Sequence, residues 1–159
     1  MNMQKDNMIE GVTMTPIAQI PDSRGTVRKF ITSGDMENGF QECYTTTIYR
    51  GIIKGLHGYK SKTIYYCVPV GVVKLVLWDN RINEANGYRS STFGQVMEVF
   101  VGVENFIRVS IPPGVMNAFQ GIAETSLAVV VADEVFDEEK TIRMLWNDPR
   151  FPYDWNKIT

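Results

Sequence analysis

Short stretches rich in β-branched and aromatic residues recur along the chain, separated by turn-forming residues such as RG, PPG and NEANG. They are CYTTTIY (43–49), TIYYCVPV (63–70), VVKLVLW (72–78), QVMEVFV (95–101), FIRVSI (106–111) and LAVVVA (127–132). In FIRVSI the apolar Ile107, Val109 and Ile111 alternate with Arg108 and Ser110, which is the two-residue period of a strand that buries one face. The pattern therefore predicts a short β-strand in each stretch.

The spacing of these stretches favours an all-β fold. No segment shows a sustained helical period, and VVKLVLW and LAVVVA are apolar nearly throughout, as expected for strands covered on both faces. Many short strands without helices between them predict an antiparallel sandwich or barrel, and a jelly roll is the form we favour. Because no repeat, low-complexity tract or linker divides the sequence, we expect one domain over residues 1–159.

Composition narrows the class of protein. The chain has 159 residues, 44% of them hydrophobic, and a net charge of -2, which fits one ordinary domain with a sizeable core. This charge and the acidic run 133–139 argue against nucleic-acid binding, which needs a clustered basic face. No stretch approaches the roughly 18 apolar residues of a membrane span, and the N-terminus lacks a signal-peptide core. Cys43 and Cys67 form no metal-binding or redox motif, so packed thiols in a reducing cytoplasm are expected.

Candidate chemistry begins with His57, the only histidine of the chain. Epimerising a carbon next to a ketone requires a base with a pKa near neutrality, a donor or cation beside the developing oxyanion, and a proton donor across the ring. Histidine is the side chain whose ordinary pKa meets the first requirement. The alternative interpretation is a histidine that packs and is hydrogen-bonded in a barrel wall.

Six ordered motifs point to one family. They are PDSRG (21–25), KGLHG (54–58), VLWDNR (76–81), STFG (91–94), IPPGVMNAF (111–119) and WNDPRFPYDW (146–155). In order and spacing they resemble the dTDP-4-dehydrorhamnose 3,5-epimerase family over residues 16–155. The resemblance implies a double-stranded β-helix of the cupin type and a homodimer whose N-terminal strands cross to the partner. It also implies a nucleotide-linked 4-keto sugar in the barrel, with His57 as the base.

Other catalytic elements of that family are matched unevenly. Alignment places Ile64 and Val130 where the family has a lysine and a tyrosine acid, and no family-like carboxylate segment follows in this sequence. Because side chains two residues apart share a face of a strand, Lys62 and Tyr66 should point the same way as Ile64 and could supply the cation and the proton donor. Alternatively, Lys62 is a solvated or phosphate-facing charge at the barrel mouth, and Tyr66 is a packing aromatic.

Asp79 matches a family aspartate that faces the interior, and it is the remaining candidate to hold the imidazole of His57. A buried aspartate that satisfies a turn is the alternative. Metal-dependent cupins commonly use two or three histidines with a carboxylate, which a chain with one histidine cannot assemble. The sequence therefore predicts no catalytic metal, and no cofactor is expected.

Candidate nucleotide-binding residues follow from the same resemblance. Arg24 matches a family arginine that reaches the diphosphate, and Lys54 stands where the family has an arginine, keeping the charge but losing the planar fork. Gln41 falls near a family glutamine. Asn117 replaces a common histidine and could bond a sugar hydroxyl, or it could satisfy a turn.

Three functions remain open at this point. The first is epimerisation at C3, or at C3 and C5, of a nucleoside-diphosphate 4-keto-6-deoxy sugar, in the biosynthesis of deoxysugars for lipopolysaccharide or O-antigen. The second is a related 3,4-ketoisomerase or dehydratase, which also passes through an enolate or enediol. The third is a cupin that binds a nucleotide sugar without catalysis.

Overall fold

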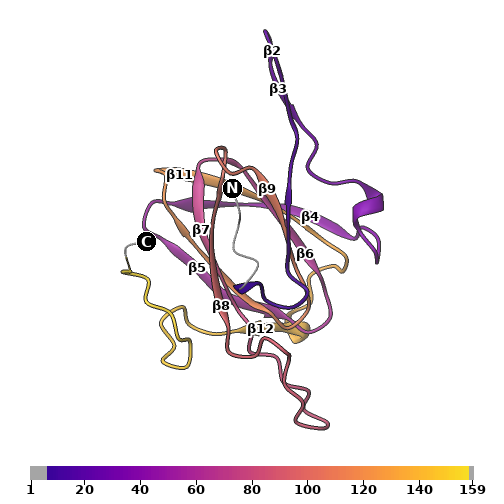
Figure 1. Cartoon of the computed structure of the whole chain (residues 1–159), viewed down its shortest axis with the longest axis vertical. Coiled ribbons are helices and arrows are strands. Elements are labelled where there is room, and N and C mark those ends of the chain that lie inside the picture. Colours follow the sequence, from indigo (N-terminus) through magenta and orange to yellow (C-terminus); the bar gives the residue numbers. More distant parts are fainter. Residues whose placement is uncertain (1–6, 158–159) are drawn as a thin grey trace.

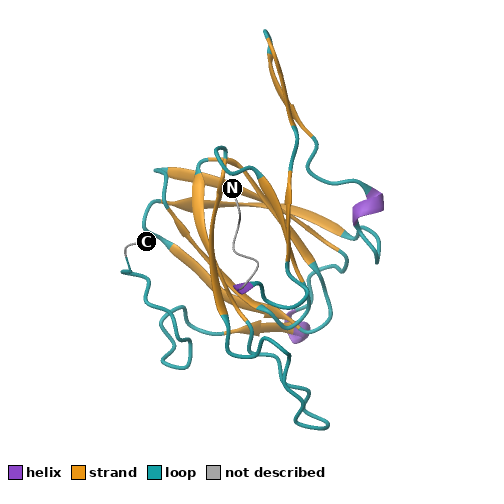
Figure 2. Cartoon of the chain, in the orientation of Figure 1, coloured by secondary structure: helices purple, strands orange, loops and turns teal. Residues whose placement is uncertain are grey.

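The computed structural model describes residues 7–157, which form β-strands and short 3-10 helical turns. Strands make up the body of the molecule, as Figure 2 shows. The 3-10 turns are η2 (Ser33–Asp35) and η3 (Glu138–Lys140). In this part of the chain no helix is long and apolar enough to cross a membrane.

Two five-stranded sheets face each other and enclose the core (Figure 1). The first sheet has the order β1 (Thr13–Pro16), β9 (Ile107–Ile111), β6 (Ile64–Val70), β11 (Thr125–Ala132) and β4 (Glu42–Tyr49). The second has the order β12 (Thr141–Arg143), β5 (Ile53–Tyr59), β10 (Met116–Gly121), β7 (Val72–Trp78) and β8 (Val96–Gly102). Neighbouring strands are antiparallel throughout both sheets. The predicted all-β jelly roll is therefore confirmed.

The predicted strands correspond to β4, β6, β7, β8, β9 and β11. The alternation in FIRVSI is confirmed, because Ile107, Val109 and Ile111 are buried and the residues between them are only partly so. The strands that the pattern missed include β5 and β10, whose sequences IKGLHGY and MNAFQG carry glycine and few β-branched residues. Pairing in the middle of the second sheet overrides this weak local preference.

The core lies between the two sheets. Its fully buried side chains include Ile48, Ile64, Leu75 and Leu77, with Phe119 nearly so. Each such side chain stabilises the fold by about 1.5–3 kcal/mol relative to exposure. Because Ile48 is buried in this core, the face of β4 that carries Ile48 is the face directed into the barrel.

A second apolar cluster covers the outer face of the second sheet. Trp78 and Met116 pack there against Phe151 and Trp155 of the C-terminal segment. This segment explains why β7 is buried on both faces. It also covers Lys74, whose Nζ lies 3.3 Å from the Trp155 carbonyl oxygen.

The stretch KGLHGYKSKTIYYC, residues 54–67, is divided between two strands. It contributes to β5 in the second sheet and to β6 in the first, with Lys60–Thr63 connecting them. Lys62 therefore lies before β6 rather than on the same strand as Ile64 and Tyr66. His57 and Tyr66 belong to opposite sheets, because the glycine-containing β5 ends at Tyr59 and the chain turns before Ile64.

The hairpin of β2 (Gln19–Asp22) and β3 (Gly25–Arg28) projects from the barrel as an arm (Figure 1). Ile20 and Val27 pair across it and are 65% and 64% exposed. A two-stranded hairpin is at best marginally stable alone. Its apolar face therefore lacks a covering layer among residues 7–157.

Candidate active site

His57 lies on β5, in the middle of the second sheet. It pairs with Asn117 of β10 on one side and with Arg143 of β12 on the other. Since Phe119, two residues after Asn117, belongs to the core between the sheets, His57 faces the barrel interior. The side chain is half-buried.

The glycines beside His57 allow this placement. Gly55 has φ of +122°, and a Cβ there would lie 2.7 Å from the carbonyl oxygen of Asn117. A Cβ on Gly58 would lie 2.5 Å from the sulfur of Met116. The motif KGLHG is thus required by the close approach of β10, and the bulge in the pairing between Lys54 and His57 occurs here.

The electrostatic surroundings of His57 favour its neutral form. Burial lowers the pKa of the imidazole first, the Arg143 guanidinium lowers it further, and the Glu138 carboxylate partly opposes this. Arg143 and Glu138 form a bidentate ion pair with distances of 3.1 and 2.9 Å. A neutral imidazole near pH 7 is the form that can remove a proton.

We expect the acid limb of the kcat/KM profile to report His57. Activity should fall as pH drops below the imidazole pKa, which lies under its ordinary value of about 6.5. Arg143→Gln should move this limb to higher pH, because a neighbouring positive charge is removed. Glu138→Gln should move it to lower pH, because a neighbouring negative charge is removed. Shifts in the same direction would contradict this arrangement.

Asn117 connects the histidine strand to Tyr66. Its side-chain nitrogen donates to the His57 carbonyl oxygen at 3.0 Å, and its oxygen accepts from the Tyr66 hydroxyl at 2.9 Å. Both residues are buried, and the Tyr66 ring packs edge-on against Phe119 at 5.4 Å. These contacts favour the packing interpretation of Tyr66 and the structural interpretation of Asn117.

Lys62 lies in the connection before β6 and is 5% exposed. Its ammonium is 3.4 Å from the Glu42 carboxylate and 4.3 Å from the centre of the Tyr59 ring. The solvated alternative is therefore wrong for this side chain. Lys62 is a buried cation whose ammonium contacts Glu42 on the inner face of β4 and the ring of Tyr59, which lies two residues after His57 on β5.

Tyr44, which the sequence analysis did not single out, lies on the sheet that faces His57. On β4 it pairs with Val130 of β11, and Val130 pairs in turn with Tyr66 of β6, so the three side chains form one row across the first sheet. Its face of the strand is that of the buried Ile48, and its hydroxyl lies beside that of Tyr59. The two-residue alternation of ECYTTTIY places Tyr44 on the same strand face as Ile48, and this pattern was the signal in the sequence that could have found it.

Asp79 belongs to a different cluster. It is fully buried and accepts hydrogen bonds from Arg81 (2.9 and 2.8 Å), Ser90 (2.6 Å) and Thr92 (2.5 Å). Burial alone would raise the pKa of this carboxyl, but the hydrogen bonds together hold it well below its ordinary range. No hydrogen bond within residues 7–157 joins Asp79 to His57, so its contacts support the turn-satisfying alternative rather than an orienting role.

Among the other candidate binding residues, Lys54 lies on the same strand as His57. Its ammonium is 2.9 Å from the Thr46 hydroxyl on the inner face of β4. Gln41 is exposed just before β4, where its backbone nitrogen donates to Ala132, and Glu42 takes the inward position beside it. Arg24 lies in the turn of the projecting hairpin, with a side chain that is 88% exposed and paired with Asp22 at 2.6 Å.

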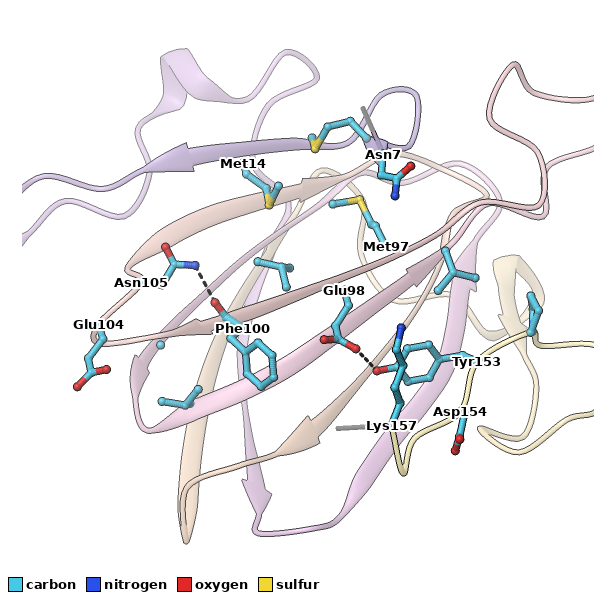
Figure 3. A pocket seen from close by; sticks show the side chains of 16 residues that line it. Asn7, Met14, Met97, Glu98, Phe100, Glu104, Asn105, Tyr153, Asp154 and Lys157 are labelled. Carbon is cyan, nitrogen blue, oxygen red and sulfur yellow. Dashed lines mark hydrogen bonds between the residues drawn. The ribbon is translucent and has the colours of Figure 1, made fainter. Parts of the chain in front are cut away.

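A cavity of about 1120 Å³ lies elsewhere on the barrel (Figure 3). It runs along β8 between Met14, Met97 and Phe100 on one side and the C-terminal segment on the other. Tyr153 donates a hydrogen bond to Glu98 across it. None of the candidate catalytic residues lines it, and within residues 7–157 no group of three or more His, Cys, Asp or Glu side chains could hold a metal ion.

A cupin barrel with a half-buried histidine facing its interior suits an enzyme of acid–base chemistry. The chain matches the family model described as dTDP-4-dehydrorhamnose 3,5-epimerase over residues 6–159. It therefore belongs to the dTDP-4-dehydrorhamnose 3,5-epimerase family. This membership confirms the class of enzyme expected from the sequence, a nucleotide-sugar epimerase.

Individual relatives match nearly the whole of this chain. It is 24% identical over 153 residues to the spore coat polysaccharide biosynthesis protein SpsL of Bacillus subtilis, covering 94% of this chain and 97% of that protein. A dTDP sugar isomerase from Desulfovibrio desulfuricans superposes with a TM-score of 0.85 at 24% identity, over 95% and 94% of the two chains. ChmJ, a 3'-monoepimerase from Streptomyces bikiniensis in complex with dTDP-quinovose, gives 0.83 at 19% identity, over 93% and 76%.

Proposed function

We propose that the protein epimerises C3 of a nucleoside-diphosphate 4-keto-6-deoxy sugar, with His57 as the base. The observation that carries this proposal is the neutral, half-buried imidazole facing the interior of a barrel of this family. Removing the proton next to the ketone gives an enolate, and returning a proton to the other face inverts the carbon. A single centre is the reaction of ChmJ, a 3'-monoepimerase, and inversion at both C3 and C5, as in the family description, is the alternative.

Two lysine side chains near His57 support a diphosphate substrate. The Lys54 ammonium lies beside Thr46 and the buried Lys62 ammonium lies beside Glu42, so both cations border the inner face of β4. Phosphate oxygens favour such charges and hydroxyl donors. Lys54 is exposed and thus available to the phosphates, whereas Lys62 is placed to neutralise charge deeper in the barrel.

The setting that we propose is a cytoplasmic pathway that makes deoxysugars for a surface polysaccharide. Cys43 and Cys67 are both free thiols, which suits a reducing compartment. The similarity to SpsL supports the polysaccharide context.

We further propose a homodimer in which the β2–β3 hairpin crosses to the partner. Its exposed Ile20 and Val27 need a covering surface, and in a dimer Arg24 would be carried with the hairpin toward the partner's substrate. The turn that holds Arg24 is stabilised by Asp22, so the guanidinium is already positioned at the end of the arm.

Ile20→Asp should weaken this dimer by roughly 30-fold or more, because an apolar anchor in an interface contributes about 2 kcal/mol. Sedimentation equilibrium measures the dissociation constant. Thr26→Asp is the matched control, since it adds the same charge to the same hairpin next to Val27 on the opposite face. Equal effects of the two variants, or a monomeric native protein, would contradict the exchange.

Product structure tests the proposed reaction. The protein is incubated with a dTDP-4-keto-6-deoxy-glucose substrate, and the sugar is characterised by NMR. Inversion at C3 supports the proposal. A ketone moved to C3 would indicate a 3,4-ketoisomerase, loss of water would indicate a dehydratase, and tight binding without change would indicate a non-catalytic cupin. Each of these three results would overturn it.

A further inference from the structure

Inversion of a carbon requires two groups on opposite faces of the substrate. If the imidazole removes the proton and is also the only donor, the proton returns to the same face and nothing is inverted. The second group must therefore come from the sheet that faces His57 across the barrel. That sheet contains β4, β11 and β6 near the site.

Three tyrosine hydroxyls lie near this region, and only one is suitably placed. Tyr59 is on the same strand as His57, two residues away, so it shares the histidine's side of the barrel. Tyr66 is on the facing sheet, but it is buried and its hydroxyl donates to Asn117. Tyr44 is on the facing sheet and is 37% exposed, so a substrate can reach its hydroxyl.

Contacts on both sides of Tyr44 fix its position relative to β5. Two residues after Tyr44 on β4, the Thr46 hydroxyl accepts a hydrogen bond from Lys54 of β5 at 2.9 Å. Two residues before Tyr44, the Glu42 carboxylate lies 3.4 Å from the ammonium of Lys62, which follows β5 in the chain. Because these contacts bracket Tyr44 along β4, it faces the middle of β5.

His57 lies in that middle part of β5, between Lys54 and Tyr59. The Tyr44 hydroxyl next to the Tyr59 hydroxyl agrees with this placement. Burial raises the pKa of the Tyr44 phenol, which keeps it protonated at neutral pH. A protonated phenol opposite a neutral imidazole is the pair that an inversion needs.

We propose that Tyr44 is the proton donor that completes the epimerisation. This inference rests on the proposed function and names the second catalytic residue. His57 takes the C3 proton, and the electrons of the C–H bond move into the ketone to form the enolate. Tyr44 then gives its hydroxyl proton to the opposite face of C3, the ketone re-forms, and a phenolate remains. The imidazolium of His57 then releases its proton to solvent, and solvent reprotonates the Tyr44 phenolate.

Tyr44→Phe tests this assignment because it removes only the hydroxyl. With a dTDP-4-keto-6-deoxy sugar in deuterium oxide, formation of the C3-inverted product should fall roughly 10²–10⁴-fold. Deuterium should still enter C3 of the recovered substrate, because His57 removes the proton and returns a solvent-exchanged one to the same face. A merely structural role would not separate exchange from inversion.

Tyr49→Phe is the matched control, since Tyr49 lies on the same strand, is 63% exposed and points to the other face. It should leave both rates unchanged. The assignment would be overturned if Tyr44→Phe inverted C3 at a rate within about threefold of the native rate. It would also be overturned if this variant lost deuterium exchange at C3 as well as inversion. If the native protein shows neither exchange nor inversion, the proposed function itself fails, and the assignment fails with it.

Discussion

His57→Ala should lower the rate of epimerisation by roughly 10²–10⁴-fold, the contribution of a positioned general base. The reason is the surroundings of the imidazole. Burial and the Arg143 guanidinium keep it neutral, and the pairing of β5 with β10 and β12 directs it into the barrel. The measurement is the initial rate of C3 inversion with a saturating nucleotide sugar.

Two observations separate a lost base from a damaged fold. The His57 imidazole makes no hydrogen bond within the described residues 7–157, so the thermal midpoint of His57→Ala should stay close to that of the native protein. Added imidazole should restore part of the lost rate, because the missing side chain leaves space for it. A variant that retains more than about a tenth of the native rate would contradict the role of His57 as base.

Asp79→Ala should produce the largest loss of stability among the site candidates. The carboxylate is fully buried and accepts from Arg81, Ser90 and Thr92, so its removal leaves a guanidinium and two hydroxyls without their acceptor. Breaking a buried ion pair costs about 3 kcal/mol or more. For a chain of this size that corresponds to a fall in Tm of roughly 6–12 °C, measured by calorimetry.

Asp148→Ala provides the matched control for this stability effect. Asp148 also pairs with an arginine two residues later, at 2.8 Å, but Arg150 is 72% exposed. Its Tm should change little, because solvent screens such a pair. If Asp79→Ala instead kept the native Tm and shifted the pH dependence of kcat/KM, Asp79 would act on His57 after all.

The fold was predictable where local pattern and burial agree. FIRVSI alternates in sequence and in burial because β9 lies in a sheet with one face on the core. KGLHG could not be recognised as part of a strand, since its glycines lower the local preference for β structure. Their use depends on how closely Asn117 and Met116 approach them, and only the folded chain shows this approach.

The sequence singles out His57 as the candidate base, a role that stays a prediction, and says less about its partners. Histidine has an ordinary pKa that suits a base, and the resemblance of KGLHG to the family motif favours this role over that of a packed side chain. Its partners depend on which strands face each other, and the division of residues 54–67 between two sheets moved Tyr66 away from the histidine strand. Tyr44 lies 13 positions before His57 in sequence, and only the pairing of β4 with β11 and its contacts with β5 bring the two together.

The position of deuterium in the product tests the central claim most directly. The native protein converts the nucleotide 4-keto sugar in deuterium oxide, and NMR then measures deuterium at each sugar carbon. Removal of the C3 proton by His57 predicts one deuterium at C3, protium at C5, and no incorporation with His57→Ala. A C3-inverted product that retains its original hydrogen at C3, or equal incorporation with His57→Ala, would contradict the account.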